Sequence, residues 1–306
     1  MEPIRNFREL KIRARELPSK TVSVVRADEV ETLIAVREAV QADMLDAILV
    51  GPETEIRRCA EEAEFDLNGI RIIDVPDDKS AAVQGVKLVR DDEAQVLLKG
   101  FVASSTYLKA ILDREHGIRG EGLLSHVTAF DIPEYDKLLI ITDAAINIAP
   151  DFDQKVTILK NAIIVAKALG IDPPKRTYVC AKEVPYDRMP RTLEAARMKE
   201  MAQNGEFGDI LFDAPLAMDL AVSPVACRIK KIESPVAGSA DVLLLPDIES
   251  CNILYKALIF LARAELGAVI MGATNPIILT SRADSAESKL CSLVLSGIVA
   301  AYDGKR

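Results

Sequence analysis

Several kinds of functional site are disfavoured by what the sequence lacks. Its 306 residues include no tryptophan, 5% aromatic residues and only two histidines. Aromatic platforms on which nucleic-acid bases stack are therefore scarce, and two isolated histidines cannot form a histidine-rich metal site. The chain contains no G-x-x-x-x-G-K-[ST] loop, no G-x-G-x-x-G turn and no G-x-S-x-G motif. The usual sequence signatures of triphosphate binding, dinucleotide binding and serine hydrolysis are thus missing.

The cysteines and the long apolar stretches give no sign of secretion or membrane insertion. The five cysteines are odd in number, widely spread and never in a C-x-x-C arrangement, so a disulfide framework is not predicted. The N-terminal MEPIRNFREL has no apolar core, and the most lipid-like stretch, 253–273, carries Lys256, Arg263 and Glu265. We therefore expect a cytoplasmic protein that does not bind membranes.

The balance of charge limits the partners. A net charge of -9, with no long basic run to offset it, argues against a general surface for nucleic acid or anionic lipid. Any phosphate site must therefore be local.

Short β-branched runs alternate with longer helical patterns along the whole chain, which predicts α/β architecture with parallel sheets covered by helices on both faces. The clearest helix is 151–170, with an aspartate at its start and a glycine at its end. Loops near 130–135 and 268–275 are the best candidates for crossings between two domains. We predict a discontinuous first domain, 1–131 plus 271–306, and a second domain, 132–270. The predicted strands are 21–26, 46–50, 70–75, 95–99, 125–127, 138–143, 177–181, 209–213, 241–245, 268–271 and 277–280.

The stretch PIILTSRADSAESKL, residues 276–290, reads as an anion site. A β-branched run ends at Ser281 and Arg282, and an amphipathic helix follows at once. Asp284 or Ser285 can cap this helix, and Asp284 with Glu287 resembles a capping box. Free backbone N–H groups at a helix start attract anions, and an arginine beside them offers a fork that matches two phosphate oxygens. The alternative is a structural arginine that caps a neighbouring helix.

Other predicted strands also end at polar residues, where open parallel sheets bind their ligands. Each of these residues can instead be a helix cap or a surface charge, and the sequence leaves that alternative open. The candidates are Lys99, Gly100, Ser104 and Thr106 after one strand, Asp143 and Asn147 after a second, and Asn252 and Lys256 after a third.

Five runs of the sequence together resemble the phosphate acetyl/butyryltransferases over most of the chain after about residue 20. The segments DAAINIAPD and LTSRADSAE look closer to the butyryl branch than to the acetyl branch. The five runs are LLKGFVASSTYLKAIL, EYDKLLIITDAAINIAPDFDQK, DAPLAMDLAVS, SPVAGSADVLLLPDIESCNILYK and MGATNPIILTSRADSAESKL.

The resemblance implies reversible transfer of a short acyl group between coenzyme A and inorganic phosphate, with acyl phosphate as the other product. It implies no metal and no bound cofactor, since coenzyme A is a substrate. It also implies a two-domain fold like that of isocitrate and isopropylmalate dehydrogenases, with an active-site cleft between the domains, in a homodimer or larger homo-oligomer. The Ser-Arg pair of the family corresponds to Ser281 and Arg282, its Lys-Gly turn to Lys99 and Gly100, and its central Asp and Asn to Asp143 and Asn147.

One position departs from the family pattern. Acetyl-specific relatives carry an acidic residue, proposed to take the thiol proton, where this chain has Ser288. Asp284 and Glu287 are the nearby carboxylates that can replace it.

Two other functions stay open at this point. One is a metal- and NAD(P)-dependent dehydrogenase of the same architecture, for which Asp143, Asp213 and Asp247 would have to converge on a divalent ion. The other is a module that binds coenzyme A or phosphate without turnover.

Overall fold

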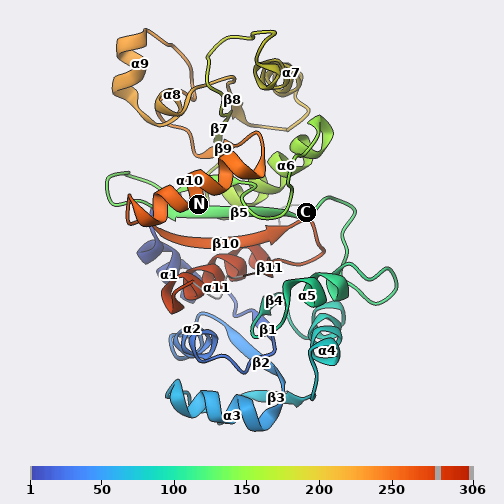
Figure 1. The fold of residues 1–306 in the computed structure, drawn as a ribbon. Helices are drawn as coiled ribbons and strands as arrows, with labels where there is room; N and C mark the ends of the chain where they lie inside the picture. The colour runs from blue at the N-terminus through green and yellow to red at the C-terminus, as the bar shows by residue number, and fades with distance from the viewer. Residues whose placement is uncertain (1, 280–283, 303–306) are drawn as a thin grey trace. The chain divides into compact units, whose positions relative to one another are not determined.

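The computed structural model describes residues 2–279 and 284–302, which form two compact units (Figure 1). Unit 1 comprises Met1–Asn6 and Leu123–Glu265, and unit 2 comprises Phe7–Gly122 and Leu266–Arg306. The N-terminal residues join unit 1 because the Ile4 N–H donates to the Leu169 carbonyl oxygen at 2.9 Å. The domain boundaries expected after residues 131 and 270 stay predictions.

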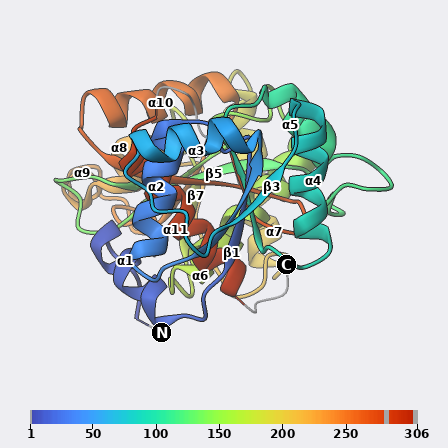
Figure 2. The ribbon, with the colours of Figure 1, turned by 90° about the horizontal axis from the view of Figure 1, so that it is seen from below.

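Unit 2 is a doubly wound sheet with helices on both faces. Its strand order is β3-β2-β1-β4-β11-β10, parallel except for the antiparallel pair β10 and β11. Figure 2 shows α1, α2 and α11 on one side of β1, with α4 and α5 on the other. The helices are α1 Phe7–Glu16, α2 Val30–Gln41, α3 Glu53–Glu62, α4 Asp78–Arg90, α5 Ser104–Ile111 and α11 Ala286–Ala301. The strands are β1 Thr21–Val25, β2 Asp46–Gly51, β3 Arg71–Asp74, β4 Val96–Lys99, β10 Glu265–Met271 (whose first residue belongs to unit 1) and β11 Ile277–Ile278.

Unit 1 is built on a second series of strands, in the order β5-β6-β9-β7-β8, with β5 antiparallel to β6 and the other pairs parallel. Its strands are β5 Ser125–Asp131, β6 Leu139–Thr142, β7 Lys175–Tyr178, β8 Leu211–Phe212 and β9 Val242–Leu244. Its helices are α6 Phe152–Ala168, α7 Pro190–Gln203, α8 Met218–Val222, α9 Pro224–Lys230 and α10 Ile248–Phe260.

Helices α6 and α10 cover opposite faces of unit 1. Ser125 on β5 accepts a hydrogen bond from Asn161 of α6, whereas Phe130 on the same strand meets Tyr255 of α10 edge to face. Because 125 and 130 differ by an odd number of residues, their side chains point to opposite faces of the strand. The predicted parallel pairing holds for the other strand pairs of the two units, whereas β5–β6 and β10–β11 are antiparallel.

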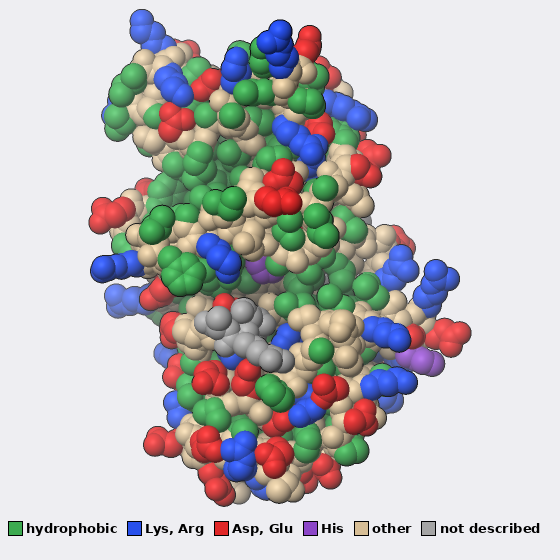
Figure 3. Space-filling view, viewed as in Figure 1, with side chains coloured by type: hydrophobic (Ala, Val, Ile, Leu, Met, Phe, Trp, Pro, Cys, Tyr) green, Lys and Arg blue, Asp and Glu red, His purple; other side chains and the backbone are tan. Residues whose placement is uncertain are grey.

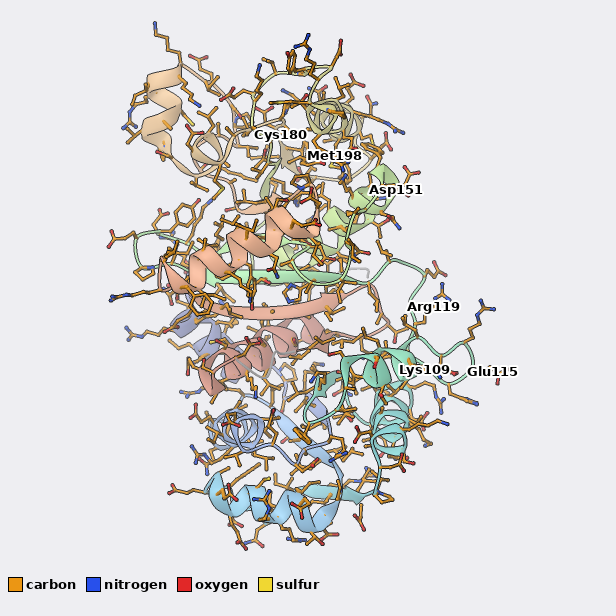
Figure 4. All side chains as sticks on the ribbon, in the orientation of Figure 1. Lys109, Glu115, Arg119, Asp151, Cys180 and Met198 are labelled. Atoms are coloured by element: carbon orange, nitrogen blue, oxygen red, sulfur yellow. The ribbon has the colours of Figure 1, made fainter. Side chains whose placement is uncertain are left out.

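Helix α6 forms as its sequence predicts. Asp151, labelled in Figure 4, accepts from the Gln154 N–H, and the Gln154 side chain accepts from the Asp151 N–H, which completes a capping box. At the other end Gly170 takes a φ of 77°, which lets the chain turn out of the helix. No helix within the described residues is long and apolar enough to cross a bilayer.

Candidate functional site

Lys99 lies at the carboxyl end of β4, where the chain leaves the sheet of unit 2. It is only 5% exposed, and its Nζ donates to the Gly100 carbonyl oxygen at 3.1 Å. A buried ammonium group is costly unless polar or anionic groups surround it. Its place at the carboxyl edge of a parallel strand makes Lys99 a candidate for binding an anionic substrate.

Gly100 is explained by a close approach of two backbone segments. A β-carbon at this position would lie 2.1 Å from the carbonyl oxygen of Arg26. The Gly100 N–H donates to the Val25 carbonyl oxygen at 2.8 Å, and the Phe101 N–H donates to that of Arg26 at 2.8 Å. Glycine therefore lets the end of β4 fit against the end of β1, and this fixes the backbone that carries Lys99.

An ion pair between Glu29 and Lys289 lies at the same edge, and sequence reasoning missed it. Lys289 of α11 is 1% exposed, and its Nζ lies 2.9 Å from Oε2 of Glu29, the N-cap residue of α2. Burial acts to raise the pKa of the Glu29 carboxyl, but hydrogen bonds from Thr32 and Lys289 and the charge of Lys99 lower it below its ordinary value. The only signal in the sequence is a lysine within the apolar face of α11.

Arg26 follows β1 at this edge, but carboxylates of the chain already hold it. Its Nε donates to Asp28 at 2.8 Å, and its guanidinium also pairs with Asp78. The hydrogen bond to Asp28 raises the pKa of Arg26 against the effect of burial. We therefore do not assign Arg26 to substrate binding.

The first turn of α5 follows Lys99 and Gly100 directly and contains Ser104 and Thr106. Its N-cap residue is Ala103, whose side chain cannot accept a hydrogen bond from the first N–H groups of the helix. This departs from an ordinary Ser/Thr cap and leaves the helix start suited to an external anion.

The predicted pair Ser281 and Arg282 lies outside the described residues. On the strand side, β11 runs parallel to β4, with Ile278 opposite Leu98. On the helix side, Ser285 is the N-cap, because its Oγ accepts from the Ser288 N–H at 3.1 Å. Of the two predicted caps, Ser285 is confirmed. The predicted Asp284–Glu287 capping box is wrong, and the Glu287 carboxylate instead forms an ion pair with Lys11 at 2.6 Å.

The structure brings Asp143, Asn147 and Asn252 together in unit 1, at the carboxyl ends of β6 and β9. Asp143 is 3% exposed, and its carboxylate accepts from the N–H groups of residues 145, 146 and 147 and from Asn147 Nδ2 at 2.6 Å. Asn252 Nδ2 donates to the Ala144 carbonyl oxygen at 3.1 Å. Lys256, one turn further along α10, is exposed, with its Nζ 5.7 Å from the Tyr255 ring centroid.

The carboxylates that a dehydrogenase would need have other partners. Asp213 pairs with Lys199 at 2.6 Å, and Asp247 caps α10 by accepting from the Ser250 N–H. Within 2–279 and 284–302, no group of three or more His, Cys, Asp or Glu residues is arranged to hold a metal ion.

Comparison with solved structures identifies the fold. The chain is similar to a branched-chain phosphotransacylase from Enterococcus faecalis, with a TM-score of 0.82 and 32% identity over 92% of this chain and 99% of that one. A putative 4-hydroxythreonine-4-phosphate dehydrogenase from Salmonella typhimurium shares the fold alone, with a TM-score of 0.60 and 10% identity over 92% of this chain and 100% of that one. The predicted two-domain, dehydrogenase-like α/β fold is confirmed, while the cleft between the domains stays a prediction.

Comparison of sequences identifies the family. Residues 77–296 match the family model described as "Phosphate acetyl/butaryl transferase". A phosphate butyryltransferase from Clostridium beijerinckii is 41% identical over 97% of this chain and 98% of its own length. A phosphate acetyltransferase from Thermotoga maritima is 39% identical over 92% of this chain and 95% of its own length. The chain belongs to the phosphate acetyl/butyryltransferase family, so the predicted enzyme class, a phosphate acyltransferase, is confirmed. The dehydrogenase alternative is not favoured.

Proposed function

We propose that this enzyme transfers a short acyl group between coenzyme A and inorganic phosphate, with butyryl preferred over acetyl. The observation that carries the proposal is the cationic edge of unit 2, where buried Lys99 and Lys289 flank Glu29 and the uncapped first turn of α5. Support for butyryl comes from the segments DAAINIAPD and LTSRADSAE. The names of the similar proteins include both butyryl and acetyl enzymes.

The reaction requires a site that binds two anionic reactants and stabilises an oxyanion. In the direction that forms acyl-CoA, the thiolate attacks the acyl phosphate carbonyl, the carbonyl π electrons move to oxygen, and collapse of this intermediate expels inorganic phosphate. We assign Arg282 to the phosphoryl oxygens or the developing oxyanion, and Ser281 to a hydrogen bond with the sulfur. Binding both reactants side by side supplies the orientational part of the rate enhancement.

Lys99 and the backbone N–H groups of residues 104–106 bind a second anionic group in this scheme. Lys99 supplies the charge, and the start of α5 supplies donors and the positive end of the helix dipole. Gly100 allows the backbone approach that orients Lys99. Asp143, Asn147, Asn252 and Lys256 stay substrate-binding candidates. The saturated carboxylate of Asp143 suits it to shaping a loop that presents backbone groups.

Two carboxylates remain candidates for the thiol proton. Glu287 is held in an ion pair with Lys11, whose Nζ lies 2.6 Å from its carboxylate. Asp284 precedes the N-cap of α11 and does not cap the helix. Both therefore stay candidates for the general base.

A covalent acyl-cysteine is the competing mechanism. Burial raises the pKa of the Cys180 thiol to about 12 and that of Cys251 well above its ordinary value. Only the thiolate is a good nucleophile, so these thiols are poorly suited to acyl transfer. This supports direct transfer, and a Cys180→Ala variant that keeps full activity would agree with it.

We also propose that the enzyme is a homo-oligomer that associates through α10. This helix exposes Ile253 and Phe260 by 70% and 74%, and Leu261, its C-cap residue, is 83% exposed. Figure 3 shows hydrophobic side chains gathered along the band that the helix occupies. Exposed apolar patches of this kind mark association surfaces. Light scattering should show a dimer or larger assembly, and Phe260→Ser with Leu261→Ser should yield monomers. A monomeric wild-type protein would contradict the proposal.

The test of function is phosphate-dependent release of coenzyme A from acetyl-, propionyl-, butyryl- and branched acyl-CoA, with and without EDTA. We expect release that requires phosphate, is insensitive to EDTA and has its highest kcat/KM with butyryl-CoA. A higher kcat/KM with acetyl-CoA would reject the chain preference. Binding of coenzyme A without any release would instead support a non-catalytic module.

A further inference from the structure

A groove of about 310 Å³ lies between α4 and α5 on the surface of unit 2. Its floor is apolar and is formed by Val83 and Val86 of α4 and Ala110 of α5. Val83 is 47% exposed, although it is a large aliphatic residue in the middle of a helix. The groove therefore offers an apolar surface that no other part of the described chain covers.

The groove has the length of a small ligand. Lys79, Val83 and Val86 follow one another along α4, and Thr106, Ala110 and Asp113 follow the same spacing along α5 and just beyond it. The first set covers seven residue steps along α4, which is two helical turns or about 10 Å at 1.5 Å per residue, and the second set runs along α5 and ends just beyond it. An elongated molecule with a flat apolar body can lie along the floor.

The rim carries two cations, Lys79 and Lys109. Neither forms a salt bridge with a residue that the structure describes, although the charge of Lys79 adds to the hydrogen bonds from Ser80 that lower the pKa of the nearby Asp77. By contrast, Lys87 and Arg90 on the same helix as Lys79 both pair with Asp91. Figure 4 labels Lys109 on α5, and Figure 3 shows several basic side chains, with acidic ones among them, on this side of unit 2. In a chain of net charge -9, this rim suits an anionic ligand.

The far end of the groove carries an acceptor. Asp113 Oδ1 accepts from the N–H groups of Glu115 and His116 at 3.0 and 2.8 Å. These two backbone hydrogen bonds, that of His116 first, lower the pKa of Asp113 and keep it ionised. The carboxylate can therefore accept from an amino group of the ligand, beside the imidazole ring of His116.

We propose that this groove binds the phosphorylated adenosine end of coenzyme A. The adenine ring lies on the valine and alanine floor, its exocyclic amine donates to Asp113, and the phosphates meet Lys79 and Lys109. The inference rests on the proposed function. Thr106 joins the groove to the start of α5, so the remainder of the molecule passes over that helix start toward Lys99.

Direct binding of adenosine 3′,5′-bisphosphate to the full chain, measured by calorimetry, tests the site without turnover. We expect wild-type protein to bind it and Lys79→Ala with Lys109→Ala to bind at least about tenfold more weakly. Val83→Trp should block the groove, while Lys87→Ala on the same helix should bind like wild type. No binding by the wild type, or equal binding by the lysine variant, would overturn the proposal.

Kinetics separate the substrate from a free nucleotide of the same chemistry. If the groove holds coenzyme A, the two-lysine variant should show a raised KM for acyl-CoA with unchanged kcat and unchanged KM for phosphate, because it loses uniform binding. An unchanged KM for acyl-CoA, with adenosine 5′-monophosphate binding as tightly as the bisphosphate, would assign the groove to a free nucleotide and overturn the proposal. Absence of acyl transfer in wild type would reject the proposed function, whereas the calorimetry would still decide whether the groove binds the nucleotide.

Discussion

The carboxyl edges of the strands in the two units hold charge in opposite ways. In unit 2, the buried cations Lys99 and Lys289 gather around one carboxylate, Glu29. In unit 1, the buried carboxylate Asp143 is satisfied by the N–H groups of the residues that follow it. Charged side chains that pair with one another can change partners when an anion binds. A carboxylate that is held by the N–H groups of its own loop cannot. We therefore expect phosphate to bind in unit 2, and Asp143 to shape a loop at this edge of unit 1.

The largest effect is expected from Arg282. Loss of one positioned oxyanion partner typically lowers the rate about a hundred- to a thousandfold, so Arg282→Ala should reduce kcat by that amount. Arg282→Lys should restore little of the lost kcat, because an ammonium group cannot make the two parallel hydrogen bonds of the guanidinium. Steady-state rates with acyl-CoA and phosphate, with circular dichroism to confirm folding, measure this. Near-normal rates in both variants would reject the role.

Substitutions of Lys99 in unit 2 and Lys256 in unit 1 compare the contribution of a lysine to catalysis at the two edges. Lys99→Met should lower kcat/KM roughly ten- to a hundredfold, since a hydrogen bond to a charged group contributes about 1.5 to 3 kcal/mol. Lys256→Met removes an exposed lysine from unit 1 and should change kcat/KM much less. An effect of Lys256→Met as large as that of Lys99→Met would erase the distinction between the edges.

Within the part of the chain that the structure describes, Arg176 is a buried cation in unit 1 that lacks the carboxylate partner found beside the buried lysines of unit 2. Arg176 is 0% exposed, and its three guanidinium nitrogens have no hydrogen-bond partner among the described residues. Burial lowers its pKa to about 9, although Asp241 and Asp172 act against this. Arg176→Met should therefore raise the free energy of unfolding by roughly 1 to 4 kcal/mol.

Denaturant unfolding at pH 7 measures that gain. The neighbouring Lys175 donates to Ser239 Oγ at 2.9 Å, and Lys175→Met is the control, expected to change the free energy of unfolding little. A large loss of stability in Arg176→Met would mean that the guanidinium has a partner in solution.

Asp143→Asn tests the structural role assigned to the edge of unit 1. The amide oxygen can accept only part of the backbone hydrogen bonds that the carboxylate accepts, so the free energy of unfolding should fall by about 1 to 3 kcal/mol. We expect the KM for phosphate to stay close to that of the wild type. A selective rise in this KM without loss of stability would place phosphate in unit 1.

The smallest expected effect is a pH-dependent change in stability caused by the Glu29–Lys289 ion pair. The folded-state pKa of Glu29 is lowered, so the ionised pair stabilises the protein above the ordinary glutamate pKa, about 4.3, and this contribution is lost as the pH falls below it. Wild type should be more stable than Glu29→Gln at pH 7, and the difference in Tm should shrink below pH 4.3. A difference that does not change with pH would contradict the ionised pair.

The sequence predicted most elements because local patterns determine them. The predicted strands 21–26, 46–50 and 95–99 correspond to β1, β2 and β4 within about one residue at each end, since each is a short apolar run between turns. Strand β7, predicted at 177–181, is Lys175–Tyr178 instead. Its register pairs Arg176 with Val242, and a buried arginine within a strand breaks the apolar pattern on which the prediction rested.

The site was predictable only where it is local in the sequence. Lys99 and Gly100 could be found because they follow a recognisable strand directly. Glu29 and Lys289 lie 260 residues apart and meet only through the packing of α2 against α11. The Asp284–Glu287 capping box was mispredicted for a similar reason. Ser285 caps α11, and the Glu287 carboxylate pairs with Lys11 of α1, which is distant in the sequence.

Hydrogen exchange of the wild-type enzyme with and without inorganic phosphate tests the central claim most directly, because it locates the anion without any substitution. We expect phosphate to slow exchange in peptides that cover residues 99–106 and 284–290 of unit 2, and to leave exchange in residues 143–147 of unit 1 unchanged. Protection confined to residues 143–147 would contradict it.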